Sequence, residues 1–166
     1  MANVAVLVSD ERIQYDGLFD LGELYKHAYN WLVWRKFDVN EKKYSEKSKG
    51  PVKDITIEWD IIKIIDEYSE YSMAIKWELR GIGDVDVKKD SGTAKMQKGE
   101  VSIWISASVK TDRQEFWTQN AFMSFMRTFY DRYLYRSTYE KLRGDMWKTA
   151  MSFKEEMKSF LNLYRY

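Results

Sequence analysis

Three stretches in the middle of the chain alternate apolar and polar side chains with the period of two that a β-strand requires. They cover residues 55–61, 71–79 and 101–110. In the last stretch one side is apolar, and the other carries Ser102, Trp104, Ser106, Ser108 and Lys110. One apolar, buried face and one mostly polar, solvent-exposed face are typical of an antiparallel sheet. The pattern therefore predicts such a sheet, with one face that needs a helical cover.

Interruptions of this alternation predict that the sheet is curved. After Ile61 the apolar positions change sides, because Ile62 and Ile64 take the polar side, and we expect a bulge or bend there. Val85 and Val87 extend the second strand beyond Gly81-Ile82-Gly83, where the glycines permit a kink. Residues 90–99 are predicted to form a polar connection.

Two further segments complete the predicted sheet. Residues 2–8 are apolar and rich in valine, which favours a strand. Residues 39–47 are polar and lysine-rich, so they form either a solvated loop or, the interpretation we favour, an edge strand that its lysines protect from aggregation.

Helical spacing appears on both sides of the strands. Apolar residues recur every three or four positions over residues 18–36, and again in the proline-free segment from Thr111 to Tyr166. Fifty helical residues would span roughly 75 Å, against a domain diameter of about 30 Å. We therefore expect a break or sharp bend near Gly144, or else a projecting arm.

These elements predict one α+β domain over residues 1–166. A curved antiparallel sheet of four to five strands packs against one N-terminal helix and a long C-terminal helix. The order of elements resembles the helix-grip arrangement of START-like proteins, in which a curved sheet wraps the C-terminal helix. This helix-grip-like resemblance rests on fold analogy alone, and it implies a ligand cavity between sheet and helix.

Composition limits the class of protein. There is no cysteine, which excludes disulfides and thiolate metal sites, and 27 basic against 26 acidic residues do not indicate a general nucleic-acid binder. The first ten residues lack the basic start and the apolar length of a signal peptide, and no segment has the roughly 18 apolar residues of a membrane span. We expect a soluble, cytoplasmic protein without a membrane span.

Candidate catalytic chemistry is sparse. His27 is the single histidine and is expected on a helix surface. Gly81 and Gly83 lack the third glycine of a dinucleotide loop, and Asp84, Asp86 and Asp90 lack the spacing of a calcium loop. We therefore expect no enzymatic activity, no cofactor and no metal site.

Aromatic residues make up 16% of the chain, which favours either a thick core or a lined cavity. Our first hypothesis is a non-catalytic binding module, in which sheet and C-terminal helix enclose an apolar pocket or groove for a small apolar ligand. The candidate wall residues are Trp59, Trp77, Phe125 and Phe129. The same side chains are equally suited to filling a solid core.

A stripe of arginines and tyrosines on the C-terminal helix supports the alternative hypothesis of an interaction protein. Its members are Arg132, Tyr135, Arg136, Tyr139 and Arg143. Such a stripe suits a protein partner or a homodimer, and RNA is the less favoured partner. Alternatively, the tyrosines extend the core and the arginines lie over it, paired with Asp131 and Glu140.

Overall fold

The computed structural model describes residues 3–90, 92–111, 121–122, 125–126, 129 and 136–163. Its elements are β1 (Asn3–Phe19), α1 (Leu21–Trp34), β2 (Asp38–Lys49), β3 (Val52–Ile64), β4 (Ser69–Lys89), β5 (Gly92–Thr111) and α3 (Arg136–Asn162). The predicted α+β class is confirmed, with five strands in one curved antiparallel sheet.

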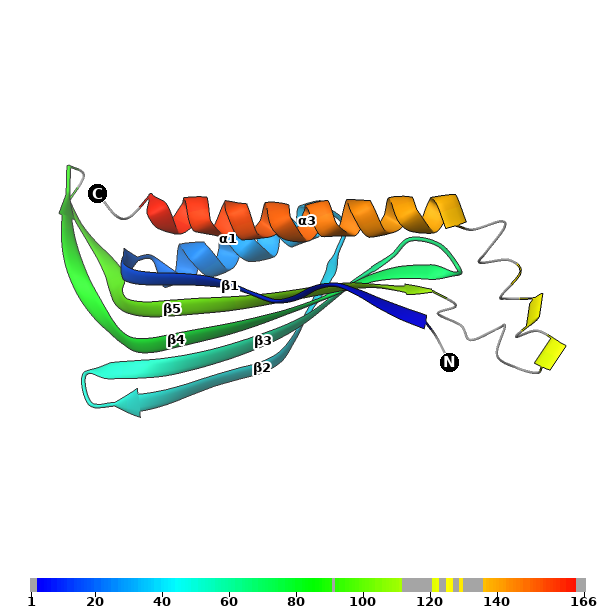
Figure 1. Ribbon diagram of the computed structural model, residues 1–166. Coiled ribbons are helices and arrows are strands. Elements are labelled where there is room, and N and C mark those ends of the chain that lie inside the picture. Colours follow the sequence, from blue (N-terminus) through cyan, green and yellow to red (C-terminus); the bar gives the residue numbers. More distant parts are fainter. Residues whose placement is uncertain are drawn as a thin grey trace.

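The strands lie in the order β1-β5-β4-β3-β2. Each neighbouring pair is antiparallel, and β1 reaches its place beside β5 from the other end of the sequence, with Asn3 opposite Thr111. The strand predicted over residues 39–47 is confirmed as an edge strand, β2. Both helices lie on the same side of the sheet, which we call the inner face; the opposite side is the outer face (Figure 1).

The inner face is apolar because alternate residues of each central strand point to it. On β3 these are Ile55, Ile57, Trp59 and Ile61, all buried. Each helix covers the inner face with one stripe of buried side chains. On α3 this stripe consists of Leu142, Met146, Ala150, Phe153, Met157 and Leu161. Trp31 of α1 meets Phe153 edge-to-face at 5.4 Å, so the two helices and the sheet share one core.

A local hydrogen bond caps the start of α1. Asp20 caps the start of α1 by accepting a hydrogen bond from the Glu23 N–H at 3.1 Å, and this satisfies one of the free donors of the first turn. Neither helix within the described residues combines the length and apolar character that crossing a lipid bilayer demands.

The strands differ from the sequence-based prediction at three places. β3 has no bulge after Ile61, because Ile61 to Ile64 stay in register with β4, and Ile62 and Ile64 simply point outward and are exposed. Residues 92–99 are not a connection, because they form the first part of β5 and pair with β4. The first strand was predicted to end at residue 8, but β1 continues to Phe19.

The predicted kink at the glycines of β4 is confirmed as a break in register between Arg80 and Gly83. Gly81 has a positive φ of 62° there, and its N–H donates to Asp54 Oδ1 at 2.9 Å. Lys49 and this N–H lower the pKa of Asp54.

Gly99 of β5 lies across the kink, where a Cβ would approach Ile82 Cδ1 to 2.5 Å and the Arg80 carbonyl oxygen to 2.9 Å. The close crossing of β4 and β5 therefore requires glycine at position 99.

The C-terminal segment differs from the prediction at Thr111 and at Gly144. Thr111 ends β5 rather than starting a helix, and the predicted break at Gly144 is wrong, because α3 runs through it without interruption. Leu142 and Met146 lie on the same buried stripe on either side of Gly144, and their burial offsets the cost of about 1 kcal/mol for a helical glycine. The part of the predicted helix over residues 112–135 lies largely outside the described residues.

Replacing glycine by alanine should have opposite effects at positions 99 and 144. Gly144→Ala should raise the free energy of unfolding by about 1 kcal/mol, because no atom lies within 4 Å of the added methyl group and alanine is the better helix former. Gly99→Ala should lower it by roughly 1–3 kcal/mol, because backbone oxygens occupy the space. Urea unfolding followed by circular dichroism measures both, and the same sign for the two variants would contradict this account of the kink.

Candidate functional site

Trp59 and Trp77 are fully buried in the core, between the sheet and α1. Their ring centroids lie 5.2 Å apart, and Tyr25 of α1 meets the Trp59 ring at 5.1 Å. Burial raises the pKa of Tyr25, and its hydrogen bond to Glu41, at 2.9 Å, raises it further. Neither indole Nε1 has a hydrogen-bond acceptor among the described residues. The aromatic rings fill this part of the space beneath α1.

The other two predicted wall residues lie elsewhere. Phe125 and Phe129 are exposed, so the structure does not bring them together with the buried tryptophan pair. The four residues predicted to line one pocket therefore belong to two environments, the packed core and the surface.

The predicted Arg/Tyr stripe lies partly outside the described residues, which do not include Arg132 and Tyr135. Arg136 is exposed, and Tyr139 is half-buried against the core. The guanidinium of Arg143 lies 5.7 Å from the Tyr139 ring centroid and 3.7 Å from Glu140. For Arg143, these contacts agree with the alternative interpretation, in which the tyrosines extend the core and the arginines lie over it, paired locally.

The single histidine connects the two helices. His27 Nε2 of α1 lies 2.9 Å from Glu156 Oε1 of α3, and its ring stacks on Phe160 at 4.7 Å. Both partners of His27 come from α3, so His27 has a structural role in joining the helices. Among the described residues, no group of three or more histidine or carboxylate side chains is placed to hold a metal ion.

A surface groove lies on the outer face of the sheet. It has a volume of about 490 Å³, and we call it the outer groove. Its lining residues come from all five strands: Asp10, Lys42, Glu58, Asp60, Ala74, Lys76, Glu78, Trp104 and Ser106. Trp59 and Ile75 also border it, although their side chains are buried in the core. Ala74 and Ser106 face each other across β4 and β5, and their short side chains leave the space between the taller neighbours.

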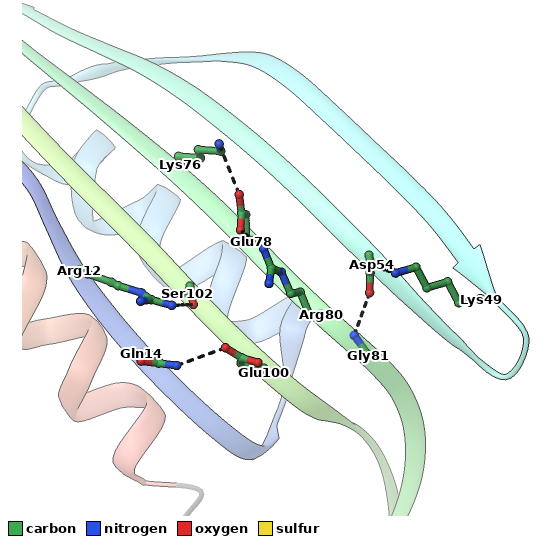
Figure 2. Close-up of polar contacts among 10 residues, drawn as sticks. All are labelled: Arg12, Gln14, Lys49, Asp54, Lys76, Glu78, Arg80, Gly81, Glu100 and Ser102. Atoms are coloured by element: carbon green, nitrogen blue, oxygen red, sulfur yellow. Dashed lines mark hydrogen bonds and ion pairs between the residues drawn. The ribbon is translucent and has the colours of Figure 1, made fainter.

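Trp104 forms the aromatic wall of the outer groove. Its cross-strand neighbours are Lys76 on β4 and Arg12 on β1. The Arg12 guanidinium lies 5.1 Å from the Trp104 ring centroid and donates a hydrogen bond to Ser102 Oγ at 3.1 Å. Figure 2 shows Arg12 and Ser102 on this polar face, with α1 behind the sheet. Arg12 is therefore positioned to hold the indole in place.

Charges of both signs line the groove, and two of its carboxylates are paired with cations. Lys42 lies 3.1 Å from Asp60, and Glu78 is held by Lys76 at 3.3 Å and by Arg80 at 3.1 Å (Figure 2). At the β1 end, the Ser106 hydroxyl accepts from the Asp10 N–H at 3.0 Å. The groove thus presents donors and acceptors in alternation beside one aromatic ring.

The outer groove was not predicted from the sequence, although one signal was present. Trp104 occupies the polar phase of its strand, between serines at 102 and 106. A large aromatic side chain on the solvated side of an alternating strand marks a surface that has more than water to contact. The other lining residues are recognisable only from the cross-strand register.

Removing the Arg12 guanidinium should change the environment of Trp104. Arg12→Met should shift the ¹⁹F resonance of Trp104 in protein labelled with 5-fluorotryptophan, assigned through Trp104→Phe, and should cost about 0.5–1 kcal/mol of stability. Lys98→Met, an equivalent change elsewhere on the exposed surface of β5, serves as the control. An unmoved Trp104 resonance in Arg12→Met would show that Arg12 does not position the ring.

Comparison with known proteins gave no match: no protein-family model matches this chain, and no similar curated protein or solved structure was found. Any proposal for the function therefore depends on the geometry of this chain alone.

Proposed function

We propose that this protein is a non-catalytic binding protein and that its ligand lies in the outer groove against Trp104. The observation that carries the proposal is a groove of about 490 Å³ with an indole wall on an otherwise polar sheet face. That volume falls within the range of roughly 300–1,000 Å³ that is usual for ligand sites, and an aromatic wall with a few polar groups is typical of them.

The packing of the core supports this location over the predicted pocket around Trp59 and Trp77. Trp59 and Trp77 pack against each other and against Tyr25, so a small apolar ligand at that point would have to displace buried rings. Displacing a buried aromatic side chain costs several kcal/mol, of the order of 3–5 for its removal. A ligand on the outer face requires no such rearrangement.

The charges of the outer groove favour a neutral, hydroxyl-rich ligand such as a short saccharide. At the Lys42–Asp60 and Lys76–Glu78 pairs, an ionic ligand of either sign would have to compete with the existing partner, while Asp10 and Glu58 add two further acceptors to the groove. A hydroxyl group, by contrast, donates to a carboxylate and accepts from an ammonium at the same time. The aliphatic face of a sugar ring can lie on Trp104 while its hydroxyls meet these groups.

The same pairing supports binding rather than catalysis. A general acid or base has to exchange a proton with the substrate, and the carboxylates of Asp60 and Glu78 are each held by a cation. Held in this way, their oxygens are placed as hydrogen-bond acceptors, which suits recognition of hydroxyl groups.

Replacing Trp104 should abolish most of the binding. We expect isothermal titration calorimetry with cellohexaose, xylohexaose, mannohexaose and chitohexaose to find at least one ligand for the unmodified protein. Trp104→Ala should raise the dissociation constant of that ligand tenfold or more, which corresponds to a loss of about 1.4 kcal/mol of binding free energy, because the stacking surface is removed.

Trp34→Ala is the matched control, because Trp34 is 83% exposed on α1 and lies away from the groove. Circular dichroism of both variants tests whether they are folded, and Trp104→Phe retains an aromatic ring should the alanine variant unfold. Absence of binding across the four saccharides, or equal affinity of Trp104→Ala and the unmodified protein, would overturn the proposal.

A further inference from the structure

The two edges of the sheet differ in how they are protected against further strand pairing. β2 is exposed at all but one position, and it carries a register shift between Glu41 and Lys43. Its lysines are Lys42, Lys43, Lys47 and Lys49. Lysines and bulges are the usual means of preventing edge-to-edge association. The β2 edge is therefore closed to a partner strand.

The β1 edge lacks this protection over its first residues. No residue from Asn3 to Val8 is charged, and Val4 and Val6 are 53% and 66% exposed. The pairing with β5 is regular from Asn3 to Val6 and becomes irregular only beyond Val6. Within the described residues, β1 has a strand on one side only, so its other side presents free N–H and C=O groups.

A second groove, which we call the edge groove, lies beside this segment. It measures about 360 Å³ and is lined by Val6, Leu7, Glu140, Arg143, Gly144 and Trp147. Trp147 of α3 is 50% exposed there, and the buried Nε–H of Arg143 has no acceptor among the described residues. An exposed tryptophan beside an uncharged strand edge is typical of a protein contact surface.

Gly144 supplies an independent indication. In the middle of a helix glycine costs about 1 kcal/mol relative to alanine. Within the described chain no atom lies within 4 Å of where its Cβ would be, so intramolecular packing does not require it. The missing side chain keeps the edge groove open. A residue that weakens its own helix while opening a surface groove fits a close approach by another chain.

We propose that the β1 edge and the adjoining side of α3 form a homodimer interface, in which Asn3–Val6 pairs antiparallel with the same segment of a second copy. A two-fold axis perpendicular to the sheet would join two five-stranded sheets edge to edge and keep both pairs of helices on one side. The two α3 helices would then approach each other at Gly144, and Trp147 would become buried.

A second copy is the occupant that the chemistry of the edge groove favours. A two-fold interface has to be self-complementary, since the same patch meets itself. The edge groove carries one acidic and one basic residue, Glu140 and Arg143, which lie 3.7 Å apart within one copy, so two such patches meet without an unbalanced charge. The uncharged Asn3–Val6 segment brings no like charges together. The proposal is independent of the outer groove, which stays uncovered in such a dimer.

Sedimentation velocity of the full chain over a dilution series tests the proposal. We expect a monomer–dimer equilibrium, and both Val6→Lys and Gly144→Leu should raise the dissociation constant of the dimer at least tenfold. Val6→Lys places a charge on the pairing edge. Gly144→Leu fills the edge groove with a better helix former, so a loss of the dimer in this variant cannot be ascribed to unfolding.

Ile64→Lys is the matched control, because Ile64 is 56% exposed on a strand but lies on β3, away from the β1 edge. It should leave the dissociation constant unchanged. Since the chain has no cysteine, the single-cysteine variants Val4→Cys and Ser48→Cys can each carry one spin label per copy. The distance between the two labels of a dimer should be shorter for position 4 than for position 48. A monomer at every concentration, or a dimer unaffected by Val6→Lys and Gly144→Leu, would overturn the proposal.

Discussion

The burial of a single face of the sheet beneath two helices determines the rest of this structure. Because side chains alternate along each strand, covering the inner face assigns every residue of β3, β4 and β5 to one side or the other. The same alternation leaves the opposite face without any described element to cover it. Both surfaces that we assign to function, the outer groove and the β1 edge, are regions that this packing leaves free.

Alternation and helical spacing were sufficient to predict the fold class from the sequence, because each depends only on near neighbours in the chain. The prediction failed where the signal was not local. Ile62 and Ile64 suggested a change of phase because exposed isoleucines are unusual on an outer face. Gly144 suggested a helix break because the cost of a helical glycine is visible in the sequence, whereas the buried stripe of α3 that offsets this cost is not. Likewise residues 92–99 read as a connection until β4 supplied their pairing partner.

The site was less accessible to sequence reasoning than the fold. Trp59 and Trp77 were recognisable as inward-facing, but not whether they line a space or fill it, since that depends on Tyr25 from a helix far away in sequence. The outer groove depends on the register of all five strands, which places Lys76 and Arg12 on either side of Trp104. A hydrophobicity pattern predicts which face a residue occupies and not which residues become its neighbours there.

The position of β1 at one edge has a consequence for synthesis of the chain on the ribosome. Asn3 pairs with Thr111, so β1 is made first and its partner β5 last among the strands, while α3, which covers both, follows later still. At roughly 5–20 residues per second, the delay is on the order of ten seconds. During that interval the apolar Asn3–Val8 stretch has emerged without a strand to pair with, which makes it a target for chaperones and for mispairing with another nascent chain.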